Sequence, residues 1–458
     1  MPNRLLLLLL VLTATSLSGC RTEGRHVITL RYWNGFTGPD GRTMLRMVKQ
    51  FNRENPDVNV LMQRMDWSTY YNKLFVAGLG GRAPELFILQ THAAPRFANA
   101  GFVRAVDDLA AQPGSLDVND IDANVWQAIS TGGKHYGVPL DIWPTGMYYN
   151  CRLLRDAGIL DSHGQPAPPT NRAQFLDAAR KLTLPARNDS SDQWGFVFTN
   201  FESNVYSLML QFGGDFFTPD YSRCIMNGPK NVEALQFCVD LIRKYKVAPP
   251  PENYDAWIGF RQGKIGMVFE GIYMLADLQK QQDLEYGGAP VPIMGEHAEY
   301  AAGSHNICIR SDLHGSELDA AWRFARFLSV NSLDWAAGGQ IPVRKSLRDT
   351  PRFKSMRVQS AFAQEIPNAH YLPRVNFIFE FMTEFDSAAE KALRGSATPQ
   401  AALDTAAANL NKIIARDRDR ETPPYGSGQA GGTGDGETTR KTNRIIARNS
   451  GAANKDGL

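Results

Sequence analysis

The 458-residue chain carries nearly balanced charge, with 49 Lys and Arg against 47 Asp and Glu, and 43% of its residues are hydrophobic. This length and apolar content predict two cores side by side rather than one. A net charge of +2 excludes recruitment of nucleic acid or an anionic bilayer by bulk charge over the whole surface. We therefore expect no nucleic-acid partner, and local features must indicate the function.

The first twenty residues have the pattern of a secretory signal that ends at a lipid-attachment site. Arg4 precedes the apolar run from Leu5 to Leu12, which is shorter than the roughly 20 residues that span a bilayer. The string LSGC, ending at Cys20, resembles a bacterial lipobox, which implies cleavage before Cys20 and its acylation. An ordinary signal followed by a chance cysteine is the alternative. We expect residues 1–20 to be this signal and the protein to be exported, on the outer face of a bacterial cell membrane or in the periplasm.

The four remaining cysteines would then lie in an oxidising compartment, where three pairings are formally open. Cys238 lies beside an apolar stripe on an expected helix, so either a buried thiol or a bridge to Cys224 fits the pattern. The sequence leaves this choice open.

Strands and helices alternate along the mature chain. The first part, with expected strands at 27–33, 58–65 and 85–89 and helices between and after them at 41–55, 70–79 and 93–100, is typical of a parallel α/β lobe. Thr170 and Ser316 are candidate N-caps of two later helices. The later elements are expected at 133–150 (a strand pair), 171–183 (helix), 265–270 and 305–310 (strands), 318–328 (helix), and 377–416 (two helices broken near Gly395 and Pro399). Beyond these, residues 421–458 have the composition of a disordered tail.

Known catalytic strings are absent from the sequence. Nucleophile-elbow, zincin and P-loop patterns do not occur, and the 8 His residues show no spacing typical of a metal site. A glycosidase pair among Asp66, Glu85, Asp141 and Glu270 is open, but any two carboxylates would satisfy that pattern. We expect no metal and no cofactor.

Aromatic residues stand beside polar residues at several expected strand ends and loops. Trp33 is followed by Asn34, Asp66 by Trp67, and Trp143 comes two residues after Asp141. Sugars present C–H faces that rest on flat rings and hydroxyls that need polar partners, so these combinations suit carbohydrate. Packing between lobes is the alternative for each aromatic residue.

In chain order, the segments resemble one family. The strings are ITLRYWNGFTG, KQFNRENPDVNV, YNKLFVAGLGGRAPELF, GGKHYGVPLDIWPTGMYYNCRLLRDAGI, PPTNRAQFLDAARKLT, FRQGKIGMVFEGIYML, AAWRFARFLS and GGQIPVRKS. Together they resemble extracellular solute-binding proteins of ABC importers, in the branch similar to maltose-binding and glycerol-phosphate-binding proteins. Glu85 stands where that family usually has Asp, and Cys151 where it usually has Lys.

The resemblance implies a type II-like periplasmic-binding-protein fold of two α/β lobes, each a mainly parallel sheet flanked by helices. It implies a first lobe of residues 27–140 plus 290–332 and a second lobe of 141–289 plus 333–420. Three crossovers would join them, near 139–146, 289–303 and 329–337. Ligand would bind in the cleft between the lobes and favour hinge closure.

The resemblance also implies ligand contacts, carried over position by position. They are Trp33, Phe36, Asp66, Trp67 and Gln90 from the first lobe, and Asp141, Trp143, Tyr273, Ser304, His305 and Arg344 from the crossovers and the second lobe. Three of these have structural alternatives: Asp141 as a group that orients the crossover backbone, His305 as a satisfied strand-end histidine, and Arg344 as a salt-bridge partner.

The expected function is capture of a small polar solute, a sugar or oligosaccharide, by a monomeric lipoprotein that delivers it to ABC permease subunits. A glycerol phosphate is less favoured because Arg31 and Arg344 alone supply few cations for a phosphate. The alternatives are a secreted carbohydrate-active enzyme, a glycosidase or lyase, and a lipid-anchored sugar sensor.

Overall fold

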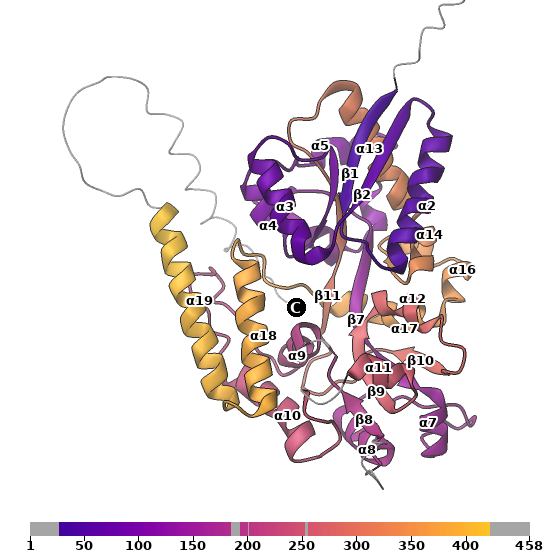
Figure 1. Cartoon of the computed structure of the whole chain (residues 1–458), viewed down its shortest axis with the longest axis vertical. Coiled ribbons are helices and arrows are strands. Elements are labelled where there is room, and N and C mark those ends of the chain that lie inside the picture. Colours follow the sequence, from indigo (N-terminus) through magenta and orange to yellow (C-terminus); the bar gives the residue numbers. More distant parts are fainter. Residues whose placement is uncertain (1–26, 185–192, 200, 252–254, 422–458) are drawn as a thin grey trace, which may run out of the picture.

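The structure is a computed structural model, and it describes residues 27–184, 193–199, 201–251 and 255–421. The expected signal, its Cys20 and all of the expected tail except Glu421 lie outside the described residues. Two sheets lie at opposite ends of the long axis, each with its own helices (Figure 1). Between residues 27 and 421, the described helices include none that is long and apolar enough to cross a bilayer.

The first sheet has the strand order β2-β1-β3-β12-β6. Strands β1, β2 and β3 are parallel, whereas β12 runs antiparallel to both β3 and β6. The strands span Ile28–Asn34 (β1), Val58–Arg64 (β2), Leu86–Gln90 (β3), Val138–Pro139 (β6) and His305–Ile309 (β12). The longer helices of this lobe are Pro39–Glu54 (α2), Trp67–Leu79 (α3) and Gly315–Val330 (α13), and the short helix Ala94–Asn99 (α4) follows β3.

Helix α2 shows why the sequence folds in this way. Met44, Met47, Val48 and Phe51 recur at helical spacing, and all four are buried in the core beneath the first sheet. Phe51 packs edge-on against Phe324 of α13 at a centroid distance of 5.0 Å. An early and a late segment of the chain therefore share one core.

The second sheet has the strand order β14-β11-β7-β9-β8, and β10 and β13 also pair with β7. The expectation of a mainly parallel sheet is wrong for this lobe, because β7 runs antiparallel to β9, β10, β11 and β13. Strand β7 carries the chain out of the first lobe and β11 carries it back, so the two must run in opposite directions. The strands span Asp141–Asn150 (β7), Trp194–Val197 (β8), Ile265–Gly271 (β9), Tyr286–Ala289 (β10), Tyr300–Gly303 (β11), Ile341–Pro342 (β13) and Ala369–His370 (β14).

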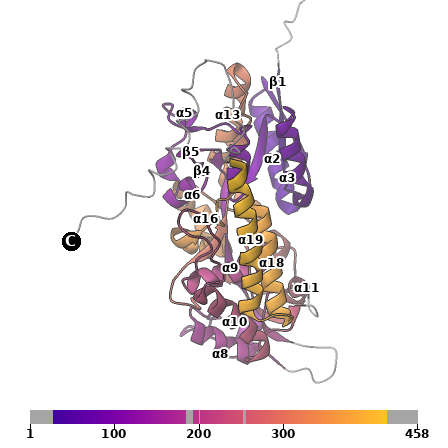
Figure 2. The same cartoon turned by 90° about the vertical axis from the view of Figure 1, so that its left-hand side faces the viewer.

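The second lobe is richer in long helices, as the sequence indicated. They are Arg172–Leu182 (α8), Phe201–Gln211 (α9), Pro229–Arg243 (α10), Ile378–Arg394 (α18) and Pro399–Glu421 (α19). Helices α18 and α19 lie side by side and extend from the level of the second lobe to that of the first (Figure 2). The predicted break between them is confirmed, because Gly395 ends α18 with a left-handed φ of 77°.

Two predicted N-caps are wrong by one or two residues. The cap of α8 is Asn171, whose side chain accepts from the backbone N–H of Gln174, whereas Thr170 lies before it. Helix α13 begins after His314, which has the extended backbone of a cap, so Ser316 falls inside the first turn.

Short helices complete the fold. They are Asp107–Ala110 (α5), Ala123–Ala128 (α6), Cys151–Asp156 (α7), Ala256–Arg261 (α11), Leu275–Leu278 (α12), Ser332–Trp335 (α14), Lys345–Arg348 (α15), Pro351–Lys354 (α16) and Arg357–Phe362 (α17). A two-stranded hairpin is formed by Ser130–Thr131 (β4) and Lys134–His135 (β5). Four 3₁₀ turns, at Val118–Asp120, Ile272–Met274, Ala336–Gly338 and Ala363–Asn368, connect longer elements.

The chain passes between the sheets where β6 meets β7, at Leu140, and where β11 meets β12, at Ser304. A third passage leads from α13 through α14 to β13. The expected first lobe includes residues 290–332, but the structure pairs β11, which lies in that range, with β7 of the second sheet.

The four cysteines of the described chain are free thiols. Cys224 and Cys238 are both buried, and neither is bonded to the other, so the bridge that the sequence left open is not formed. Burial raises the pKa of Cys224 to about 11 and that of Cys238 further still.

Candidate ligand site between the lobes

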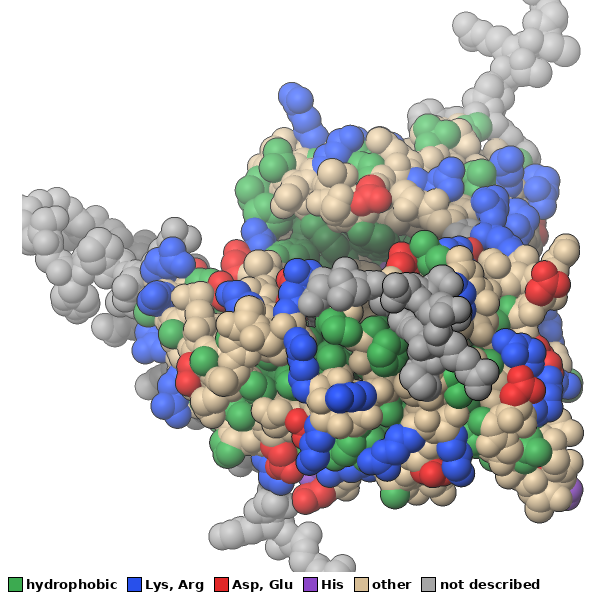
Figure 3. All heavy atoms as spheres, turned by 60° about the horizontal axis from the view of Figure 1, so that its bottom comes forward, with side chains coloured by type: hydrophobic (Ala, Val, Ile, Leu, Met, Phe, Trp, Pro, Cys, Tyr) green, Lys and Arg blue, Asp and Glu red, His purple; other side chains and the backbone are tan. Residues whose placement is uncertain are grey.

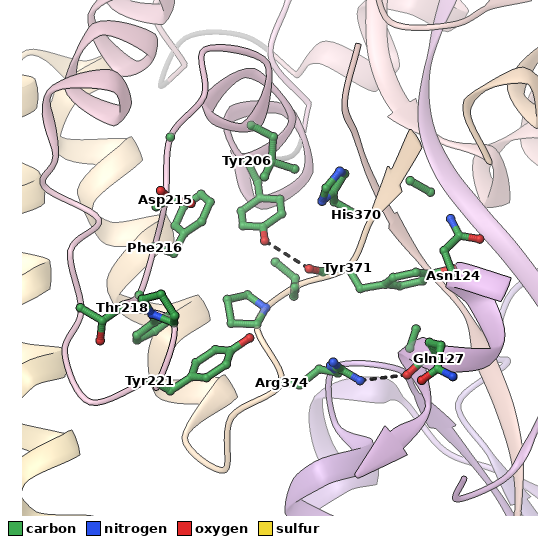
Figure 4. A pocket seen from close by; sticks show the side chains of 18 residues that line it. Asn124, Gln127, Tyr206, Asp215, Phe216, Thr218, Tyr221, His370, Tyr371 and Arg374 are labelled. Atoms are coloured by element: carbon green, nitrogen blue, oxygen red, sulfur yellow. Dashed lines mark hydrogen bonds between the residues drawn. The ribbon is translucent and has the colours of Figure 1, made fainter. Parts of the chain in front are cut away.

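A pocket of about 550 Å³ lies between the two lobes (Figure 4). Its first-lobe wall is α6, its second-lobe wall is α9 with the loop that follows, and its third wall is residues 369–374. We call residues 369–377 the cleft segment. The side chains that converge on the pocket in Figure 4 include Asn124, Gln127, Tyr206, Asp215, Tyr221, His370, Tyr371 and Arg374.

The cleft segment is bonded to both lobes. On the first-lobe side, Arg374 Nη1 donates to the carbonyl of Gln127 at 2.9 Å, and Asn99 Nδ2 donates to Asn376 Oδ1 at 2.8 Å. On the second-lobe side, Tyr206 donates its hydroxyl to the carbonyl of Tyr371 at 3.2 Å (Figure 4). The segment therefore bridges the lobes along one side of the pocket.

A smaller cavity of about 20 Å³ adjoins this pocket near the hinge. It holds about one water molecule in this conformation. Both lobes line it, with His92 following β3 and Trp143 lying on β7, and it shares Tyr206, Tyr371 and Leu372 with the larger pocket.

Two residues that line this cavity carry a buried polar atom without a hydrogen-bond partner. The indole N–H of Trp143 and the hydroxyl of Tyr371 are buried and have no partner among the described residues. A buried polar group without a partner costs about 1–3 kcal/mol, and such groups call for a specific explanation. Both residues line the same cavity, where a water or a hydroxyl of a ligand can form hydrogen bonds with polar groups of either lobe.

Three aromatic side chains predicted from sequence are each packed against a glycine. An added Cβ would lie 2.1 Å from the Trp67 ring at Gly35, 1.9 Å from the Trp143 ring at Gly303, and 2.0 Å from the Tyr273 ring at Gly271. Any larger residue would displace the ring, so glycine allows each close approach. Glycine at these three positions therefore determines where the three rings lie.

A third pocket, of about 530 Å³, lies between α3 and α4 of the first lobe and the C-terminal helices. Trp67 and Tyr71 form part of it, with Phe379 of the cleft-facing end of α18 opposite them. The Tyr71 and Phe379 rings lie 5.1 Å apart, and Arg96 stacks on Phe379 at 5.5 Å. Aromatic surface from both lobes therefore extends beyond the smaller cavity.

Several residues predicted from the sequence gather at the hinge. The ring of His305 lies 4.9 Å from Phe36, 5.7 Å from Trp67 and 5.9 Å from Trp143. Tyr273 lies 6.0 Å from Trp143.

Phe36, Asp141 and Ser304 are fully buried and line none of the pockets described above. Asp141 accepts from the backbone N–H and the ring of His305, which matches the structural alternatives for both residues. Gln90 is half-buried, and its Oε1 accepts from the hydroxyl of Tyr71 at 2.9 Å.

Asp66 caps α3 by accepting from the backbone N–H of Ser68, and hydrogen bonds from Ser68 lower its pKa. Arg344 is paired with Asp120 at 2.8 Å, as its structural alternative proposed, and lines none of the three pockets. Trp33 is partly buried, and the ammonium of Lys73 lies 5.7 Å from its ring centre.

The sequence reasoning missed the cleft segment, His92 and Tyr206. Tyr371 and Arg374 lie in an irregular stretch without periodicity, so no pattern marks them. His92 directly follows Gln90 and Thr91 at the end of a predicted strand, a position that could have identified it.

Comparison with known families assigns the chain. Residues 37–331 match the sequence model of the bacterial extracellular solute-binding proteins, which is more than half of the chain. The chain belongs to this family. The predicted family is thereby confirmed.

Relatives and solved structures of such solute-binding proteins are similar over most of the chain. An arabinooligosaccharide-binding protein of Bacillus subtilis is 24% identical over 78% of this chain and 84% of its own length. A maltotriose-binding protein of Pyrococcus abyssi is 21% identical over 75% of this chain and 72% of its own.

The fold is shared with solved sugar-binding proteins. The sugar-binding protein MalE of Xanthomonas citri superposes with a TM-score of 0.75 at 21% identity, covering 86% of this chain and 99% of that one. A substrate-binding protein of Listeria monocytogenes in complex with cycloalternan gives 0.72 at 23%, covering 85% and 99%. The predicted two-lobed α/β fold is confirmed.

Proposed function

We propose that this solute-binding protein captures a sugar or oligosaccharide between its lobes and delivers it to the permease of an ABC importer. The observation that carries the proposal is a pair of adjoining pockets lined by both lobes, in which aromatic side chains such as Trp143, Tyr206 and Tyr371 stand beside polar ones. A sugar hydroxyl both donates and accepts, so it can bond to the amide, hydroxyl and indole groups of these walls. The rings held on Gly303 and Gly35 supply flat surfaces for sugar C–H faces.

The charge of the pockets favours a neutral ligand over a phosphate. Among the described residues lining the 550 and 20 Å³ pockets, Arg374 is the one Lys or Arg, and its guanidinium is already bonded to main-chain carbonyls. Burial lowers the pKa of His92 to about 4, so its imidazole is neutral at pH 7. Phosphate recognition needs several convergent cations or N–H donors, which these walls do not supply.

The names of the relatives support the same class of ligand. The relatives of Bacillus subtilis and Pyrococcus abyssi are named for an arabinooligosaccharide and maltotriose, and the Listeria monocytogenes structure holds cycloalternan. Binding would proceed without turnover, with Trp67, Gln90, Trp143 and Tyr273 as ligand contacts beside Tyr371. Because the pocket walls come from both lobes, ligand binds the closed form more tightly than the open one.

We also propose export and anchoring through a lipid on Cys20. The LSGC string supports this, although it lies outside the described residues. The protein would act as a monomer with lobes bounded approximately as the sequence predicts, with β11 in the second lobe.

The test is a thermal-shift screen of the mature protein against mono- and oligosaccharides, polyols and glycerol phosphates. A ligand that binds only the folded state raises the melting temperature. We expect a sugar to do so, to be recovered unchanged, and to bind Trp143→Ala more weakly. The control is Trp194→Ala, which removes a partly buried indole on β8 that lines none of these pockets. Chemical conversion of the ligand would refute binding without turnover and favour a secreted carbohydrate-active enzyme. A shift in melting temperature with glycerol phosphates alone would refute a sugar as the ligand.

A further inference from the structure

Asp141 is a fully buried carboxylate that lies where the chain first leaves the first lobe. It is the first residue of β7 and follows Leu140, the passage from β6. Burying a carboxylate is costly unless hydrogen bonds compensate it, so its partners show what it holds. Each of its partners lies on a different passage between the lobes.

The first partner of Asp141 is His305, which lies on the second passage between the lobes. Asp141 Oδ1 accepts from the backbone N–H of His305 at 2.9 Å, and Oδ2 accepts from Nδ1 of the same residue at 2.9 Å. In return, the backbone N–H of Leu140 donates to the carbonyl of His305 at 2.8 Å. His305 is the first residue of β12, directly after the passage at Ser304.

The second partner of Asp141 is Trp335, which lies on the third passage between the lobes. Oδ2 of Asp141 also accepts from the indole N–H of Trp335 at 2.6 Å. Trp335 ends α14, is fully buried, and packs against Phe36 at 4.8 Å. Just beyond it, Pro342 of β13 pairs with Asp141 itself.

We propose that Asp141 is the hinge-positioning residue of this protein, a single carboxylate that ties the three passages together so that the lobes rotate about one point. This inference rests on the hinge closure of the proposed function and adds how the hinge is built. Asp141 touches no pocket described above and acts through His305, whose ring stands between Trp67 of the first lobe and Trp143 on β7. The lobe rotation is thereby coupled to two indoles that line pockets, Trp143 in the smaller cavity and Trp67 in the pocket beside α18.

The consequence is a narrow range of lobe orientations. Loss of a hydrogen bond to a buried charged group releases one passage from the others. In Asp141→Asn, the amide oxygen still accepts a hydrogen bond. The amide NH₂, however, replaces the other oxygen and points a donor at an N–H group that had donated to it. In Trp335→Phe, a six-membered aromatic ring stays, but the bond to Oδ2 is lost together with part of the buried ring volume. Both variants should let the lobes sample a wider range of angles.

The test measures interlobe distances without any ligand, so it does not depend on which solute binds. Dyes are placed by unnatural amino acids at Lys49 on α2 and Lys181 on α8, both exposed, and distances are measured by single-molecule energy transfer. We expect a broader distance distribution in Asp141→Asn and in Trp335→Phe than in the unsubstituted protein. The matched control is Glu85→Gln, which breaks partly buried ion pairs within the first lobe and should lower stability without broadening the distribution.

Distributions of the two hinge variants that superpose on the unsubstituted protein, while their melting temperatures fall as in Glu85→Gln, would show a purely stabilising carboxylate and overturn the inference. If Asp141→Asn does not fold, Trp335→Phe decides alone. If no sugar changes the distribution or the melting temperature of the unsubstituted protein, the proposed function fails, whereas the comparison of variants still stands.

Discussion

Replacement of Gly303 by Ala tests whether the close packing of Trp143 shapes the ligand site. Gly303 lies opposite Trp143 in the pairing of β11 with β7. An added Cβ would be 1.9 Å from the nearest indole carbon, with two further ring carbons within 2.4 Å. Carbon atoms pack at about 3.5 Å or more, so the ring must withdraw by about 1.6 Å.

That displacement has a cost in stability and a consequence for binding. Extra atoms in a well-packed interior destabilise by about 1–3 kcal/mol, which is the decrease we expect in the free energy of unfolding. The ring centroid of Trp143 also lies 6.0 Å from that of Tyr273 and 5.9 Å from that of His305. Moving the Trp143 ring therefore alters its packing against both neighbours and the wall of the smaller cavity. Affinity for the sugar should fall together with stability.

Urea unfolding gives the free energy, near-ultraviolet circular dichroism reports the indole environment, and calorimetry with the sugar from the screen gives the affinity. Gly80→Ala is the control, because its added Cβ would meet no atom closer than 3.4 Å, an ordinary contact. A Gly303→Ala protein with an unchanged near-ultraviolet spectrum and unchanged affinity would refute the reasoning.

Three further predictions concern titratable groups. Burial raises the pKa of Glu85, but the hydrogen bonds from Arg31 outweigh burial and hold that pKa below 4.5. Ionised Glu85 therefore stabilises the folded state above about pH 4.5, and this stability is lost as the pH falls through the folded-state pKa. Urea unfolding should show Glu85→Gln less stable than the parent at pH 7, with the gap closing in acid; a constant gap contradicts the assignment. Burial, with Glu390 nearby, raises the pKa of Asp386 from 3.8 to about 6, so the stability it contributes in acid is lost as pH rises through 6, and Asp386→Asn should be more stable than the parent at pH 7 but not at pH 4. Burial raises the pKa of Cys224 to about 11, so alkylation at pH 8 followed by mass mapping should modify Cys224 only after unfolding; modification in the native state would contradict its burial.

Elements with a strong period were predictable. Helix α2 could be predicted from the spacing of Met44, Met47, Val48 and Phe51, because a buried helix face requires apolar residues three and four positions apart. The direction of strands in the second sheet was not predictable in this way. A period of two residues identifies a strand but carries no information about its neighbours, and β7 has neighbours from four separate parts of the chain.

The candidate site was only partly predictable for a related reason. Trp67 and Trp143 could be selected because they stand beside polar residues at strand ends, and both line pockets. Asp141 was selected by the same pattern, yet its neighbours in space come from residues 164 and 194 positions away, and they turn it inward. Tyr371 has no local pattern, since its role arises only when the cleft segment lies between the lobes.

The position of β12 in the first sheet has a consequence for how the protein matures. This strand lies between β3 and β6 and contains residues 305–309. The sheet of the amino-terminal lobe therefore lacks its β12 strand until two-thirds of the chain has crossed the membrane. Contacts between such distant segments form slowly. A chain threaded across a membrane from its amino terminus would therefore stay unfolded during most of its transit, and the lobe would close only on the far side.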